Sequence, residues 1–234
     1  IAGSVCAGPP AGGPSAELFI WGGGKTAAEA QASLDQYRDR SAEWSDIVVL
    51  APDYPRILES ASVPGLKPGV IIVVLGVCAA PDTAAAMKYL KALEPGVYSR
   101  TVSWSGTGSG SALACPGLAG GWSFHGVKRA RTSDGELAGA LFLQNETTEG
   151  GEFEFKRWKA FFALRGPKRE LPSRLVDVSR SDVSILKAFK AGASGLILDE
   201  EYTDPLCTGA PTFKQYGRTR TYSSSSGDIR AGEE

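Results

Sequence analysis

The feature that most constrains the fold is a unit that occurs twice between residues 18 and 102. Each copy has an apolar strand that stops at a glycine, Gly22 or Gly76, followed by a short turn and an alanine-rich helix. The spacing from that glycine to Ala30 in the first copy equals the spacing to Ala84 in the second. A strand that leads into a helix, repeated once, predicts a βαββαβ sandwich whose two helices cover one sheet face and leave the other open.

Local patterns set the bounds of these elements. Thr26 and Glu29 have the spacing of a capping box, which predicts a helix that starts at Ala27. The run at residues 70–75 is the most apolar and should be the central strand. The other strands are expected at residues 18–21, 47–50 and 97–102, and the second helix at residues 82–93. We therefore expect an α+β, ferredoxin-like domain over residues 17–104.

Composition divides the rest of the chain. Residues 1–16 are rich in Gly, Pro, Ala and Ser and should form a flexible arm, and residues 105–112 have the composition of a Gly/Ser linker. Residues 113–222 show short apolar segments between glycine-rich turns, which predicts a smaller, mostly β second domain with one short helix from Ser181 to about Gly192. Residues 223–234 contain little to bury and should be a mobile tail.

Charge and hydropathy exclude several functions. The 234-residue chain has a net charge of -1, so no general attraction to nucleic acid is expected. The longest apolar run, residues 70–80, is too short to cross a bilayer, so no transmembrane segment is expected. The sequence starts at Ile1 without an initiator Met, which indicates a processed N-terminus and an extracytoplasmic location: periplasmic, cell-surface or secreted.

Four cysteines lie far apart, at Cys6, Cys78, Cys115 and Cys207. None forms a C-x-x-C pair and the chain has one histidine, so a metal site is not expected. Four cysteines allow three disulfide pairings. We favour Cys6–Cys78 with Cys115–Cys207, because each bond would then hold one half of the chain; four buried thiols are the alternative.

No motif predicts catalysis or a cofactor. Gly22–Gly24 followed by Lys25 and Thr26 looks like the end of a phosphate loop, but the loop needs a glycine where Phe19 stands. The glycines therefore predict a tight turn. His125 is the only imidazole and no nucleophile-elbow pattern is present, so we expect a surface or structural histidine and no enzyme.

One region carries a family resemblance. Residues 64–69, with the sequence Pro-Gly-Leu-Lys-Pro-Gly, precede the strand at residues 70–75, which is followed by Gly76 and the helix that contains Ala84. The final strand begins Gly-Val-Tyr-Ser-Arg at residues 96–100. This arrangement resembles the second half of a SPOR domain, a peptidoglycan-binding module of bacterial envelopes. The likeness covers well under half of the chain.

The resemblance implies a non-catalytic extracytoplasmic protein that binds cell-wall glycan with its open sheet face. Aromatic rings stack on sugars, and Arg or hydroxyl groups fix their orientation. The residues able to do this are Trp21, Tyr54, Arg56, Tyr98 and Arg100. The alternative is that these rings are core or subunit contacts. The chain would then be a structural subunit of a secreted or surface assembly, such as a filament, coat or adhesin, whose partners are neighbouring subunits.

Overall fold

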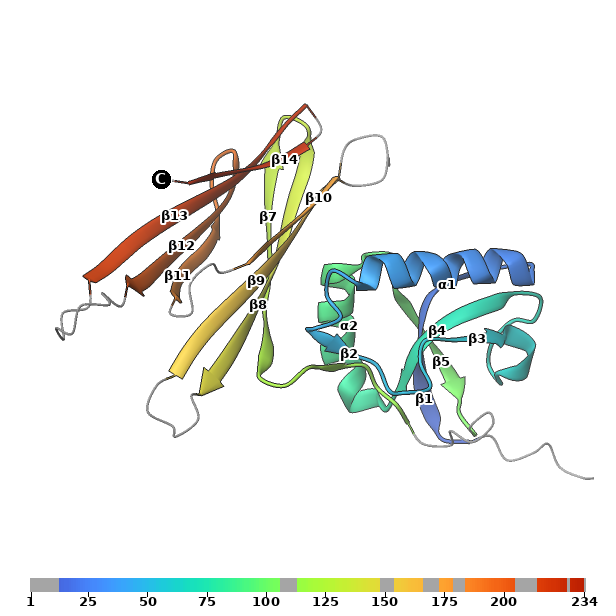
Figure 1. The fold of residues 1–234 in the computed structure, drawn as a ribbon. Coiled ribbons are helices and arrows are strands. Elements are labelled where there is room, and N and C mark those ends of the chain that lie inside the picture. The colour runs from blue at the N-terminus through green and yellow to red at the C-terminus, as the bar shows by residue number, and fades with distance from the viewer. Residues whose placement is uncertain are drawn as a thin grey trace, which may run out of the picture. The chain divides into compact units, whose positions relative to one another are not determined.

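The chain divides into two compact units, Ile1–Gly117 and Leu118–Glu234 (Figure 1). The computed structural model describes residues 13–105, 113–147, 154–165, 173–178, 184–204, 214–226 and 228–233. Of the predicted linker at residues 105–112, only Ser105 is among the described residues. Of the predicted arm at residues 1–16, only residues 13–16 are described. Ser15 and Ala16 are the first residues of a strand.

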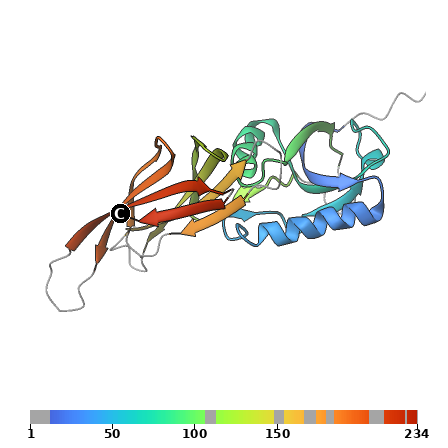
Figure 2. The same cartoon turned by 90° about the horizontal axis from the view of Figure 1, so that it is seen from above.

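The first unit is built on an antiparallel sheet with the order β3–β4–β1–β5. Two helices follow β1 and β4, and Figure 2 shows α1 lying along one side of the sheet. The elements are β1 (Ser15–Gly24), α1 (Ala27–Ser41), β2 (Val48–Val49), β3 (Arg56–Glu59), a 3-10 turn (Ser60–Ser62), β4 (Ile71–Cys78), α2 (Ala80–Leu93) and β5 (Tyr98–Ser103). The short strand β2 pairs with β6 (Gly117–Leu118).

The start of α1 confirms the capping box. The Thr26 hydroxyl accepts a hydrogen bond from the Glu29 amide at 3.2 Å, and the Glu29 carboxylate accepts one from the Thr26 amide at 3.2 Å. Ala30, Leu34 and Tyr37 are the buried residues of this helix. The central position of the apolar strand is also confirmed, because β4 lies between β3 and β1.

The expected fold class is wrong. The described residues form a mostly β protein with two α-helices and four separate antiparallel sheets, and not a ferredoxin-like α+β arrangement. The second strand expected in the main sheet, at residues 47–50, corresponds to β2, which pairs with β6 outside that sheet. Its place is taken by β3, whose residues were expected to be a connection. Tertiary pairing decided between two short segments of similar β propensity.

The sheet face away from α1 is buried, where an open face was expected. Leu18, Ile20 and Val74 are at most 2% exposed and belong to one core cluster. Val63 and Leu66, from the connection between β3 and β4, pack in the same cluster. The long connection therefore covers apolar strand surface that would otherwise face water.

A disulfide joins Cys78 and Cys115, whose Cα atoms are 4.5 Å apart. The predicted pairing is therefore wrong, because Cys78 was expected to bond Cys6; Cys6 and Cys207 lie outside the described residues. The reason lies in an isolated antiparallel bridge between Val77 and Ala114, in which the Val77 amide donates to the Ala114 carbonyl at 2.9 Å. This bridge places the two following cysteines side by side.

The second unit is a β-sandwich of two antiparallel sheets, seen as two layers in Figure 1. One sheet has the order β10–β9–β8–β7 and the other β11–β12–β13–β14. Side chains from both sheets meet in one core, including Phe162, Leu164, Phe189 and Leu198. The strands are β7 (Trp122–Thr132), β8 (Gly135–Thr147), β9 (Glu154–Arg165), β10 (Ser173–Val178), β11 (Ser184–Ala191), β12 (Gly195–Asp204), β13 (Lys214–Ser225) and β14 (Asp228–Glu233).

Two expectations for this unit are corrected. The helix expected from Ser181 to about Gly192 is strand β11 from Ser184 onward, paired along β12 with one register shift near Leu186. That shift breaks the alternation of side chains, and the short apolar run then looks helical in the sequence. Of the expected mobile tail, residues 223–225 are the end of β13 and residues 228–233 form β14, whose backbone pairs with β13. Within the described residues, no helix has the length and apolarity needed to cross a membrane.

Candidate functional site

Four of the five predicted ligand residues lie on one face of the first sheet. Register pairs join Arg56 to Val74, Val74 to Ile20, and Ile20 to Tyr98, so these side chains form a row across the four strands. Arg100 follows Tyr98 by two positions on β5 and shares its face. Tyr54 packs against the same core cluster as Tyr98. The structure therefore brings Tyr54, Arg56, Tyr98 and Arg100 to one side of the sheet.

Trp21 lies apart from these four residues. Its indole meets the Tyr37 ring of α1 edge-on, with centroids 5.3 Å apart, so it belongs to the helix side. The register of β1 against β4 shifts between Ile20 and Gly22, which leaves Trp21 as an inserted residue. Trp21 is therefore a packing contact of α1, and it does not share a surface with Tyr98.

Arginine–aromatic pairs mark the shared face. The Arg56 guanidinium lies 4.9 Å from the centroid of Tyr54 and 5.5 Å from that of Trp104, and Arg100 lies 5.0 Å from the centroid of Tyr98. Burial raises the pKa of Tyr54 more than neighbouring Arg56 lowers it, so its hydroxyl stays a neutral donor. Trp104 was not predicted, although the alternation that puts Tyr98, Arg100 and Val102 on one face points to it.

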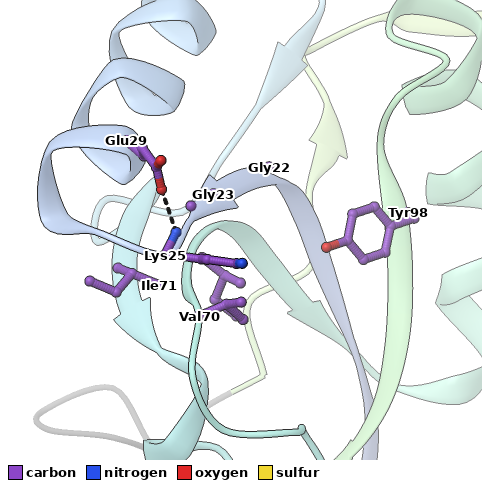
Figure 3. Close-up of a pocket in the computed structure, with 9 residues that line it drawn as sticks. Gly22, Gly23, Lys25, Glu29, Val70, Ile71 and Tyr98 are labelled. Atoms are coloured by element: carbon purple, nitrogen blue, oxygen red, sulfur yellow. Dashed lines mark hydrogen bonds between the residues drawn. The ribbon is translucent and has the colours of Figure 1, made fainter.

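A pocket of about 620 Å³ opens beside Tyr98 (Figure 3). It is lined by Gly22, Gly23, Gly24, Lys25, Glu29, Val70, Ile71, Ile72 and Tyr98. The side chains of Lys25 and Tyr98 point toward one another across it in Figure 3. Tyr98 is the only predicted ligand residue among the lining residues. The others come from the glycine run and from the start of β4.

Packing accounts for the three glycines. A Cβ on Gly23 would lie 2.1 Å from the Ile71 carbonyl oxygen, and the φ angle of Gly23 is +154°. A Cβ on Gly24 would lie 2.1 Å from the Cβ of Glu29. The chain therefore needs glycine where β1 passes close to β4 and where it turns into α1. The three glycines are the last residues of β1 and pair with β4, so the tight turn expected at this run is wrong.

Two amides just ahead of α1 already have an anionic partner. One carboxylate oxygen of Glu29 accepts hydrogen bonds from the Lys25 amide at 2.6 Å and from the Thr26 amide at 3.2 Å. A phosphate at this position would meet the negative charge of Glu29, so the pocket is a poor nucleotide site.

The remaining groups suit an uncharged ligand with hydroxyl groups. Tyr98 offers a hydroxyl and an aromatic ring, and Lys25 offers an ammonium donor. Val70, which is 41% exposed, and the neighbouring isoleucines provide apolar surface. A sugar ring has one apolar face and a rim of hydroxyls, so this combination of ring, donor and aliphatic surface can hold one.

A second polar cluster lies inside the sandwich and was not predicted. The Arg220 guanidinium, 1% exposed, donates to both carboxylate oxygens of Asp177 at 3.1 Å and lies 3.3 Å from a carboxylate oxygen of Glu200. Tyr222 donates to Asp177 at 2.7 Å, and the Trp158 indole donates to Glu200 at 2.9 Å. Burial and the bond to Asp177 raise the pKa of Tyr222. The cluster joins both sheets and is enclosed, so its role is structural.

Other candidate groups do not assemble into a site. His125 is exposed on β7 at a register shift between Phe124 and Gly126. In the part of the chain that the structure describes, no group of His, Cys, Asp and Glu has the arrangement of a metal site. No protein family, curated protein or solved structure matches the chain in sequence or fold.

Proposed function

We propose that the protein is a non-catalytic binding protein for a hydroxyl-rich polymer, a cell-wall glycan such as peptidoglycan, and that the ligand binds in the pocket beside Tyr98. The observation that carries this proposal is the composition of the pocket. It combines an aromatic ring, an ammonium group and aliphatic side chains, and the Glu29 carboxylate beside them carries a negative charge that disfavours a phosphate.

The neighbouring face supports the same proposal. Arg100 is exposed and lies over Tyr98, so a guanidinium group adjoins the pocket, whereas Trp104 beside Arg56 is 3% exposed and belongs to the covered part of the sheet face. A linear glycan with one sugar in the pocket could place a neighbouring sugar against Arg100. An extracytoplasmic location belongs to this proposal, and the Cys78–Cys115 disulfide favours an oxidising compartment.

Co-sedimentation with purified peptidoglycan sacculi tests the proposal. The wild-type chain should pellet, and Tyr98→Ala and Lys25→Ala should each weaken binding about tenfold, since each removes a contact of 1–2 kcal/mol. Lys91→Ala, which removes an exposed lysine of α2 away from the pocket, is the matched control and should bind normally. A wild-type chain that pellets no more than an unrelated protein would refute the proposal.

A structural subunit is the second candidate function, favoured by β14. This strand lies at the end of the order β11–β12–β13–β14, and its residues from Asp228 to Gly232 are exposed except for Ile229, which is half-buried. An exposed edge can pair with a strand of another subunit. Light scattering across a hundredfold range of concentration should then show ordered oligomers, which Arg230→Pro should abolish. A monomer at every concentration would exclude this candidate.

A further inference from the structure

We propose that the second unit binds a linear acidic polysaccharide on the face of the β7–β10 sheet that points away from the sandwich core. The contacts would come from the arginine group, which consists of the exposed residues Arg129, Arg131 and Arg165. This group lies at the end of the sheet where β7 turns into β8, which Figure 1 shows at one end of the sandwich. The inference does not rest on the pocket beside Tyr98.

Strand register places the arginine group on one face. Arg131 on β7 pairs with Glu136 on β8, and Glu136 pairs with Arg165 on β9, so these three side chains form a row across the sheet. Arg129 lies two positions before Arg131 on the same strand and therefore shares its face. Leu137, which follows Glu136, belongs to the core of the sandwich, so the row faces away from that core.

Positive charge exceeds negative charge at this end of the face. The Glu136 carboxylate lies 3.4 Å from the Arg129 guanidinium, and these side chains are 48% and 62% exposed. One carboxylate cannot neutralise the whole arginine group, and an exposed ion pair is weak enough for a ligand to replace. Two further charges, Asp134 in the turn and Arg174 on β10, offset each other in number. The chain has a net charge of -1, so the positive charge is a local feature.

The shape between the arginines suits a flat ligand. Ala138 on β8 pairs with Arg129 and with Ala163 on β9, so the two middle strands carry short side chains between longer ones. Adjacent strands are about 4.8 Å apart, which separates Arg129 on β7 from Arg165 on β9 by about 10 Å across the sheet. A sugar ring can pack its apolar face on the alanines, and carboxylates at its rim can reach guanidinium groups on both sides. Guanidinium groups bind carboxylates through two parallel hydrogen bonds.

The aromatic side chain nearest to the arginine group along β9 favours a polysaccharide over a nucleic acid. Phe161, two positions before Ala163, is 8% exposed, and the Lys159 ammonium lies 5.4 Å from the centroid of its ring. Proteins that hold single-stranded nucleic acid combine phosphate contacts with stacking of bases on exposed rings. Because the Phe161 ring is covered, a nucleic acid would gain phosphate contacts alone at this end of the face.

The test measures the affinity of the full-length chain for an oligomer of galacturonic acid, which carries one carboxylate on each sugar, by calorimetry at low salt. Arg131→Ala and Arg165→Ala should each weaken binding several-fold, and the double variant should weaken it about tenfold or more, because each change removes a charge-assisted contact. Arg38→Ala is the matched control, because it removes one exposed arginine from α1 in the first unit and changes the net charge equally. It should bind as the wild type does.

Glu136→Gln should have the opposite effect and tighten binding about threefold, since it removes the competing negative charge from the row and keeps the size of the side chain. A variant that only disturbed the fold would lose affinity instead. Raising the salt concentration should weaken the wild type more than the double variant, because the wild type forms more ionic contacts with the oligomer.

The proposal is wrong if the wild type does not bind the oligomer at low salt, or if the double variant binds as tightly as Arg38→Ala. A methyl-esterified oligomer has the same sugars without the charge and should not bind; equal binding of both oligomers would exclude the arginine group as the site. Single-stranded DNA with the same number of charges should bind more weakly than the galacturonic acid oligomer. Tighter binding of the DNA would overturn the choice of a polysaccharide as the partner.

Discussion

The cores of the two units are held together by different kinds of interaction. In the first unit, one sheet face packs into a cluster of aliphatic side chains around Leu18 and Val74, and a disulfide joins the end of β4 to Cys115. In the second unit, the core of the sandwich includes a charged cluster that connects β10, β12 and β13 through Asp177, Glu200 and Arg220. Apolar packing is tolerant of small shifts, whereas a buried arginine needs its carboxylates in one arrangement.

This difference suggests where specificity resides in each unit. Meandering sheets of similar strands can pair in several registers, and a buried ion cluster penalises every register but one. The first unit has helices and a covalent bond to define its arrangement. We infer that the cluster selects the pairing of the two sheets more than it adds stability, and the changes below test that contrast.

Breaking the charged cluster should have the largest effect. Arg220→Met leaves Asp177 without its guanidinium partner and leaves Glu200 with Arg218 alone, and removing one member of a buried pair costs about 3–5 kcal/mol. Urea unfolding measures the loss, and hydrogen exchange should place it in the second unit. Arg230→Met, at an exposed position on β14, should stay within about 0.5 kcal/mol of the wild type. An equal loss in both variants would contradict the role of the cluster.

Removing the covalent bond tests the first unit. The double variant Cys78→Ala and Cys115→Ala opens a loop with a sequence separation of 37 residues, which should cost roughly 2–4 kcal/mol. Thermal unfolding with and without a dithiol reductant measures it. The reductant should destabilise the wild type and leave the double variant unchanged. If the unfolding temperature of the wild type did not change with the reductant, the disulfide would add nothing to stability.

Tyr89 gives a smaller effect in the same unit. Its hydroxyl donates to the Pro116 carbonyl, and burial raises the pKa of Tyr89 to about 12. Tyr89→Phe should cost about 1 kcal/mol at pH 7. The neutral phenol is favoured in the folded state, so this stabilisation is complete below pH 10 and is lost as pH rises from 10 toward 12. Urea unfolding at pH 7 and pH 11.5 should show a difference between the two proteins that shrinks at the higher pH.

Removing an exposed ion pair in the sandwich should cause the smallest loss of stability. Lys190 and Thr219 donate to Asp199 at 2.8 Å and 3.0 Å, and these bonds, with that of Lys190 first, hold the pKa of Asp199 below its usual value. Asp199→Asn should cost about 0.5 kcal/mol at pH 7, because the pair is exposed to solvent. A lowered pKa means that the stabilisation is present above about pH 4 and is lost as pH falls further. Unfolding at pH 7 and pH 2 measures this, with Asp228→Asn as the control.

Sequence patterns predicted elements well where the signal is local. The capping box at Thr26 and Glu29 marks the start of α1, and the apolar run at residues 70–75 marks β4 as central. The fold class failed because it depends on pairing between distant segments. Nothing local distinguishes residues 47–50 from residues 56–59 as the neighbour of β4, and only the assembled sheet decides between them.

In the candidate site too, features set by neighbouring residues were predicted and those set by distant strand pairing were not. Alternation along β5 correctly groups Tyr98 with Arg100, but Trp21 falls on the other side because an inserted residue shifts the register of β1. Lys25 and Glu29 were recognised as turn and cap residues, and their place in a pocket became visible only with the structure. The buried cluster around Arg220 was missed entirely, because its members come from four different strands and its hydrogen bonds join residues as far apart in sequence as Asp177 and Arg220.

The sequence by itself determined the two strands that each lead into a helix and the capped start of α1, because each follows from residues that are neighbours along the chain. The ends of the two strands were misplaced, because β1 and β4 continue past Gly22 and Gly76 to Gly24 and Cys78. Tertiary structure alone decided the Cys78–Cys115 bond, the covered sheet face, the strand β11 where a helix was expected, and the meeting of Glu29 with Lys25 at one end of the pocket. These features depend on which distant strands pair and in which register, and a register is selected by the burial of whole faces together.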